Sequence, residues 1–98
     1  MAEFKNDELG VSFTVPDRLT VRQQLAYFSQ AGLAQRKEFI ERLWLGAKNI
    51  IEDWKCDLIP DIEFDLEKNT NTRVTQVIIW ASLEVKKHFD ALDDIPKN

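Results

Sequence analysis

The chain has 98 residues, of which 44% are hydrophobic and 31% charged, with only 3 glycines and 3 prolines. This composition excludes a disordered chain, favours long regular elements over a loop-rich sandwich and predicts one globular domain over residues 1–98. The formal net charge of −4 argues against a protein that binds nucleic acid by neutralising phosphates. A single cysteine, Cys56, excludes an internal disulfide bond and favours a reducing compartment.

The N-terminal third predicts a strand followed by a helix. Residues 1–8 are polar, and we expect them to be flexible. Apolar and polar residues alternate over 11–15, which predicts a short strand that Pro16 ends. Thr20 and Gln23 have the spacing of a capping box, so a helix is predicted over about 20–30. Its expected buried face consists of residues at helical spacing, Val21, Leu25 and Phe28.

The longest amphipathic stretch predicts a central helix over 33–54. Apolar residues recur there at intervals of three and four, and charged residues fall on the opposite side. We expect the rest of the chain to cover this apolar face, which is formed by Ile40, Leu43, Ala47, Ile50 and Trp54.

The acidic stretch that follows predicts a second short strand. Ile62, Phe64 and Leu66 alternate with acidic residues, so residues 62–66 could pair with 11–15 in a two-stranded ribbon. The alternating carboxylates also resemble the first ligands of a calcium-binding loop. That loop needs glycine at its sixth position and glutamate at its twelfth, where this chain has Leu66 and Thr72. A solvated strand face is therefore the preferred interpretation.

A last helix is predicted over 72–92, capped by Asn71 or Thr72. Apolar residues recur there at intervals of three and four, namely Val74, Ile78, Ala81 and Val85. The run of β-branched residues in 73–80 also allows a strand. We expect 95–98 to be flexible. Together these elements predict an α+β fold that is mostly α, with three helices at about 20–30, 33–54 and 72–92 and a two-stranded ribbon of 11–15 and 62–66.

The residues give no catalytic, metal-binding or cofactor-binding pattern. His88 is the only histidine and Cys56 the only cysteine, so neither a zinc site nor a nucleophile–base pair can be assembled at a known spacing. We expect a core-edge histidine, a buried cysteine, no enzymatic activity, no cofactor and no small-molecule ligand. No run of 18 apolar residues and no apolar signal core is present, so we expect no membrane partner and a cytoplasmic location.

Some apolar residues do not fit a single buried face. On a helical projection, Ile79 and Leu83 fall opposite the main stripe of the last helix, with Trp80 to the side. On the central helix, Leu45 falls among charged residues. One interpretation is that the last helix is buried on both sides. The other is that Ile79, Leu83, Trp80 and Leu45 form a protein interface, either with a partner or with another copy.

Two segments, VSFTVPDRLTVRQQLAYFSQ at 11–30 and IIWASLEVKKHFDALDDIPKN at 78–98, resemble small proteins encoded among the tail genes of tailed bacteriophages. Some of these are tail-assembly chaperones that hold the tape-measure protein. The resemblance implies a non-catalytic protein-binding factor in phage tail assembly, located in the host cytoplasm. The alternatives are a structural subunit of an oligomeric, virion-associated particle, and an acidic regulatory protein.

Overall fold

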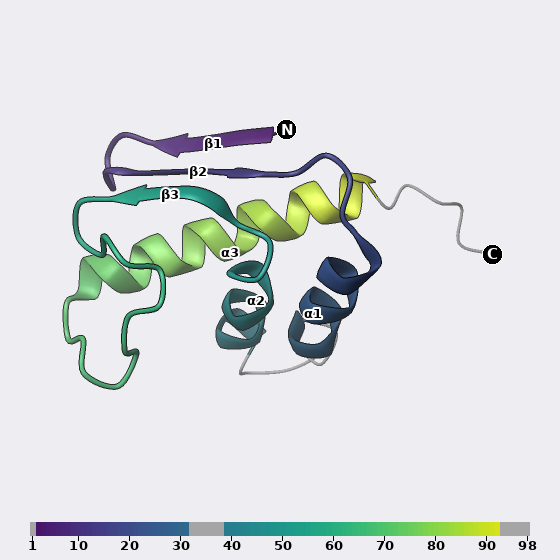
Figure 1. The fold of residues 1–98 in the computed structure, drawn as a ribbon. Coiled ribbons are helices and arrows are strands. Elements are labelled where there is room, and N and C mark those ends of the chain that lie inside the picture. The colour runs from purple at the N-terminus through teal and green to yellow at the C-terminus, as the bar shows by residue number, and fades with distance from the viewer. Residues whose placement is uncertain (1, 32–38, 93–98) are drawn as a thin grey trace.

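The computed structural model describes residues 2–31 and 39–92 and shows a three-stranded sheet beside three helices. In Figure 1 the strands lie at the top, the long helix α3 runs beneath them, and α1 and α2 lie below α3. The sheet is antiparallel with the order β1-β2-β3, and α2 packs against both α1 and α3. The elements in chain order are β1 (Ala2–Asn6), β2 (Val11–Val15), α1 (Val21–Ala31), α2 (Phe39–Ala47), β3 (Glu52–Cys56) and α3 (Thr72–Leu92).

The first strand was not predicted. Residues 2–6 pair with β2 in register, so that Phe4 lies opposite Phe13. The hairpin turn uses the φ of +66° at Gly10, a conformation that suits glycine. Any side chain at position 10 would also meet the carboxylate of Asp57 at 3.2 Å. The strand at 11–15 is confirmed, with Val11, Phe13 and Val15 buried.

The predicted central helix is shorter than expected. Helix α2 ends at Ala47, residues 52–56 form β3 instead, and the stretch 33–38 lies outside the described residues. Tight backbone bonds from Asn49 to Gly46 and from Ile50 to Ala47 end the helix. Because β2 offers an unpaired edge, the chain from residue 52 gains a ladder of hydrogen bonds there, and tertiary pairing overrides the helical spacing.

The predicted strand at 62–66 is also wrong, because this segment consists of turns and irregular backbone. The Asp61 carboxylate accepts a hydrogen bond from the Glu63 amide at 2.9 Å, and Asp65 accepts one from Glu67 at 2.9 Å. Such local side-chain bonds favour turns over strand pairing. The mostly-α fold with a two-stranded ribbon is therefore corrected to an α+β fold with a three-stranded antiparallel sheet.

The last helix has the predicted bounds. Asn71 caps it, since its side-chain oxygen accepts a bond from the Arg73 amide at 2.9 Å. The Arg73 guanidinium in turn donates to the carbonyl of Glu8 at 2.6 Å and fixes the first hairpin against the start of α3.

The core is built on a chain of contacting aromatic rings. Phe13 lies at its centre, stacked on Phe4 at 5.1 Å and on Trp54 at 5.9 Å, with Trp80 of α3 edge-on at 5.7 Å. Trp54 continues the chain to Trp44 of α2. Sheet, α2 and α3 therefore share one core, which also holds the buried residues Val15, Ile50, Val77, Ala81 and Val85.

Candidate protein-docking surfaces

Helix α1 begins at the predicted capping box. The Gln23 amide donates to the Thr20 hydroxyl oxygen at 3.1 Å, and the Thr20 amide donates to the Gln23 side-chain oxygen at 2.9 Å. In both bonds the donor is a backbone N–H group that would have no partner at the start of an uncapped helix. Residues 20–30 were therefore assigned correctly as a helical segment with this start.

The exposed face of α1 was not predicted. Val21 is 71% exposed, Leu25 66% and Phe28 47%, although their spacing had assigned them to the core. Among residues 21–29 of α1, whose burial is described, Tyr27 is the buried one, on the other side of the helix. Periodicity shows that an apolar stripe exists, but not which neighbour covers it. We call Val21, Leu25 and Phe28 the α1 stripe.

The four residues predicted as an interface have different environments. Ile79 and Leu83 are each 38% exposed on adjacent turns of α3. Trp80 is half-buried and packs against Phe13, and Leu45 is half-buried on α2. The structure thus brings Ile79 and Leu83 together at the surface, whereas Trp80 belongs mainly to the core.

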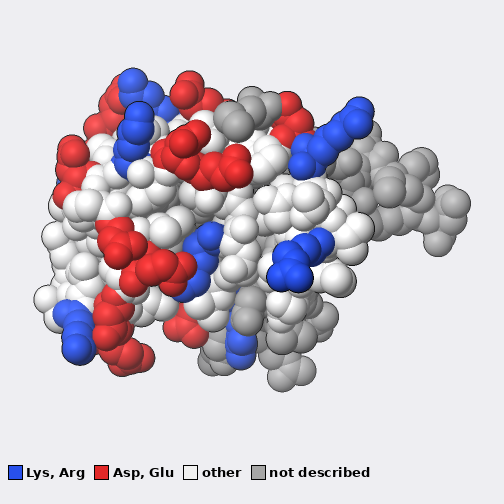
Figure 2. Space-filling model, viewed as in Figure 1, with Lys and Arg blue, Asp and Glu red and all other residues white. Residues whose placement is uncertain are grey.

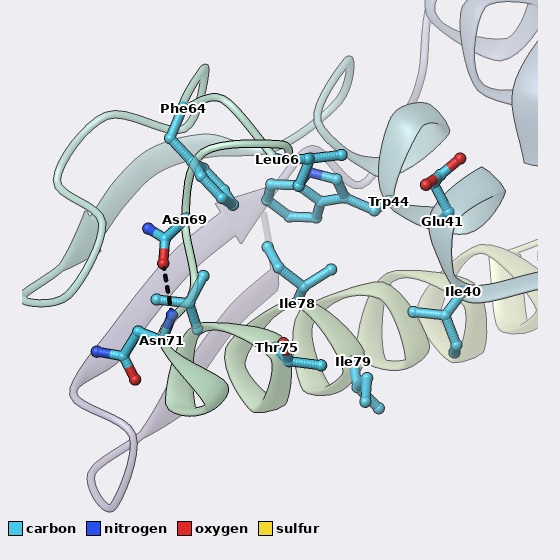
Figure 3. Close-up of a pocket in the computed structure, with 11 residues that line it drawn as sticks. Ile40, Glu41, Trp44, Phe64, Leu66, Asn69, Asn71, Thr75, Ile78 and Ile79 are labelled. Carbon is cyan, nitrogen blue, oxygen red and sulfur yellow. Dashed lines mark hydrogen bonds between the residues drawn. The ribbon is translucent and has the colours of Figure 1, made fainter.

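An apolar groove of about 190 Å³ lies between α2, α3 and the segment that precedes α3. Figure 3 shows Phe64 and Leu66 over it from that segment, Trp44 and Ile40 from α2, and Ile78 from α3. We call this the α2–α3 groove. Polar side chains also line it, namely Glu41, Asn69, Asn71 and Thr75.

Specific bonds hold the wall of this groove in place. The Lys48 ammonium at the end of α2 lies 3.2 Å from a carboxylate oxygen of Glu63, next to Phe64. The Asn71 amide donates to the Asn69 side-chain oxygen at 3.0 Å, the dashed line in Figure 3. At its mouth Leu66 remains 41% exposed, so the groove presents apolar surface to solvent.

Charge is distributed unevenly around these two surfaces. Residues 57–67, here called the acidic segment, carry five carboxylates and no lysine or arginine. Helix α1 contains Arg22 and no acidic residue, and Arg18 precedes it. On the face shown in Figure 2, acidic side chains gather at the left, where Figure 1 places the turn segment, with basic side chains beside them, and the surface over α1 shows basic and uncharged side chains only.

The two side chains that could take part in chemistry, Cys56 and His88, do not belong to either surface. Cys56 is buried, and His88 is half-buried with its ring edge-on to Phe4 at 5.6 Å, as the sequence predicted. Among residues 2–31 and 39–92, no cluster of three or more His, Cys, Asp or Glu side chains could hold a metal ion. Within the same ranges, no helix combines the length and apolarity that a membrane crossing requires.

Comparison with known proteins adds no relative on which to base a site. No protein-family model, curated protein or solved structure matches the chain.

Proposed function

We propose that this chain is a non-catalytic protein-binding factor that presents the apolar α1 stripe to a partner protein. The observation that carries the proposal is the exposure of Val21 and Leu25, at 71% and 66%, on adjacent turns of a capped helix. Contiguous exposed apolar surface is typical of protein interaction sites. Burial of such side chains contributes roughly 1.5–3 kcal/mol each, so a partner that covers them gains affinity.

The partner that fits best is an amphipathic helix with an acidic polar face. The α1 stripe offers apolar residues at positions i, i+4 and i+7, the spacing at which two helices contact each other. Arg22 is exposed on the same helix, and α1 carries no acidic side chain. Opposite charges on the partner helix would orient it and speed association.

The resemblance of residues 11–30 and 78–98 to tail-assembly proteins supports phage tail assembly as the setting. The α1 stripe lies within the first of these segments, and Ile79 and Leu83 lie within the second. In that setting the stripe would cover apolar segments of a tape-measure protein, the partner that the resemblance implies. This part of the proposal depends on the sequence resemblance alone.

A binding assay with matched peptides tests the proposal. One labelled peptide has leucines at helical spacing and an acidic polar face, and the other has the same composition in an order that breaks the apolar face. We expect the wild-type chain to bind only the first, and Leu25→Glu to weaken that binding tenfold or more, which corresponds to about 1.4 kcal/mol. The control Gln76→Glu adds the same charge at an exposed position of α3, away from the stripe, and should bind as the wild type does. Equal binding of both peptides, or no loss in Leu25→Glu, would refute the proposal.

A structural subunit of an oligomeric particle is the second candidate function. The separation of the acidic segment from Arg18 and Arg22 at the start of α1 favours it, because oppositely charged surfaces allow copies to assemble. Light scattering separates the two candidates. A defined ring supports the subunit, and a monomer that binds the amphipathic peptide supports the binding factor.

A further inference from the structure

We infer that the α1 stripe of one copy docks into the α2–α3 groove of a second copy, head to tail. The inference rests on the proposed function in one respect, since both require the α1 stripe to be a protein-docking face. It goes further by naming the occupant and the surface on which the occupant sits.

The two surfaces match in size and polarity. The groove measures about 190 Å³ and is lined by apolar side chains, including Trp44, Phe64 and Ile78. A cavity of roughly 150 Å³ lined by such residues holds a benzene ring, so the groove can take one large apolar side chain. The α1 stripe offers Leu25, which is 66% exposed, at its centre.

The charges around the two surfaces are also complementary. Phe64 and Leu66 belong to the acidic segment, so exposed carboxylates such as Glu67 lie close to the groove in sequence, and Glu41 lines it from α2. Arg18 and Arg22 are exposed at the start of α1. When the stripe enters the groove, a helix without acidic residues therefore meets a segment with five carboxylates, of which Glu63 is paired with Lys48. A second copy of an acidic chain is thus attracted at this site, even though the net charge of −4 on each copy opposes association elsewhere.

The stripe and the groove are different surfaces of the same molecule, which determines the kind of assembly. A contact between unlike surfaces leaves one free stripe and one free groove on every pair. Assembly then continues until a ring closes or a filament forms.

Two variants, each with one of the two surfaces blocked, provide the test. Leu25→Glu blocks the stripe, and Leu66→Lys places a cation in the mouth of the groove. Both side chains are exposed in the folded chain, so neither substitution damages the core. Gln76→Glu and Gln76→Lys are matched controls, because they add the same charges at an exposed position of α3 that belongs to neither surface.

Molar mass is measured by light scattering over a wide concentration range. We expect the wild type and both controls to reach multiples of 11.4 kDa, and each blocked variant to stay at 11.4 kDa. An equimolar mixture of the two blocked variants should double in mass and stop there, because one intact stripe and one intact groove remain. A wild type that stays at 11.4 kDa, blocked variants that still associate, or a mixture that stays monomeric would each overturn the inference. If the wild type is monomeric and Leu25→Glu still loses the peptide, the proposed function stands and only this inference falls.

Discussion

The ring of Trp54 stacks on the ring of Phe13 at a centroid distance of 5.9 Å and an interplanar angle of 25°, across strands β3 and β2. This contact depends on an irregularity in the sheet. Between Ser12 and Thr14 of β2 the register with β3 shifts by one residue, so that Asp53 and Trp54 together oppose Phe13. The bulge aims Trp54 at the same face as Phe13, and its indole N–H donates to the carbonyl of Ile59 at 2.8 Å.

Truncation of Phe13 should cost more stability than truncation of any surface aromatic residue. Phe13 is 1% exposed and contacts three other rings, so Phe13→Ala is expected to lower the free energy of unfolding by about 3–5 kcal/mol. Urea unfolding followed by tryptophan fluorescence measures the change. Phe28→Ala is the matched control on the α1 stripe, where we expect a loss of about 1 kcal/mol or less. Similar losses in the two variants would contradict the assignment of Phe13 to the centre of the core.

The bulge leads to a second prediction, which concerns the stability of variants at Asp53. Its φ of +53° lies in the left-handed region, which aspartate and asparagine tolerate better than β-branched residues do. The Thr14 hydroxyl donates to the Asp53 carboxylate at 3.2 Å, and an asparagine oxygen could accept the same bond. We expect Asp53→Asn to match the wild type in thermal unfolding and Asp53→Val to lose about 1–3 kcal/mol. Glu52→Val, at the adjacent exposed strand position, controls for the change in hydrophobicity. Equal stability of the two valine variants would show that position 53 is unstrained.

Ser82 offers a stabilising substitution. Its side chain is fully buried in α3, and its hydroxyl has no hydrogen-bond partner within the described part of the chain. A buried hydroxyl without a partner costs about 1–3 kcal/mol, and alanine is also the better helix former. We expect Ser82→Ala to raise the free energy of unfolding by about 1 kcal/mol, measured in urea. A decrease of that size would mean that the hydroxyl has a partner in solution.

The capping box of α1 should contribute measurably to stability. Thr20→Ala removes the oxygen that accepts the Gln23 amide, and loss of such caps costs about 0.5–2 kcal/mol. Thr70→Ala changes an exposed threonine outside any helix and should be neutral. The same urea titrations apply to both. An equal effect of the two variants would indicate that α1 gains little from its cap.

The sequence predicted those elements whose signals are local. The strand at 11–15 alternates strictly, α1 has a capping box, and α3 keeps its helical phase without glycine or proline. The predictions failed where a segment fits one type of secondary structure by its apolar spacing but contacts with other parts of the chain, or hydrogen bonds to its own backbone, favour another. Residues 48–54 fit a helix, but the unpaired edge of β2 draws 52–56 into the sheet. Residues 62–66 alternate as a strand does, but Asp61 and Asp65 bond to their own backbone and form turns.

The exposed apolar residues were predictable only in part. Ile79 and Leu83 stand out in the sequence because they fall outside the main stripe of their own helix, and both are exposed. The α1 stripe could not, because an amphipathic helix in a sequence looks the same whether its own fold or a partner covers the apolar side. The groove was also missed, since Phe64 and Leu66 had been placed in a strand.

A photo-crosslinking residue in place of Leu25 tests the central claim, that the α1 stripe is covered by protein, most directly. The purified chain is irradiated alone and with the amphipathic acidic peptide, and a second chain carries the same residue in place of the exposed Lys5 on β1. We predict adducts from position 25 that map to the apolar face of the peptide or to the α2–α3 groove of another copy, and none above background from position 5. If irradiation leaves the position-25 chain at 11.4 kDa in both mixtures, the stripe is not a docking face and the account is wrong.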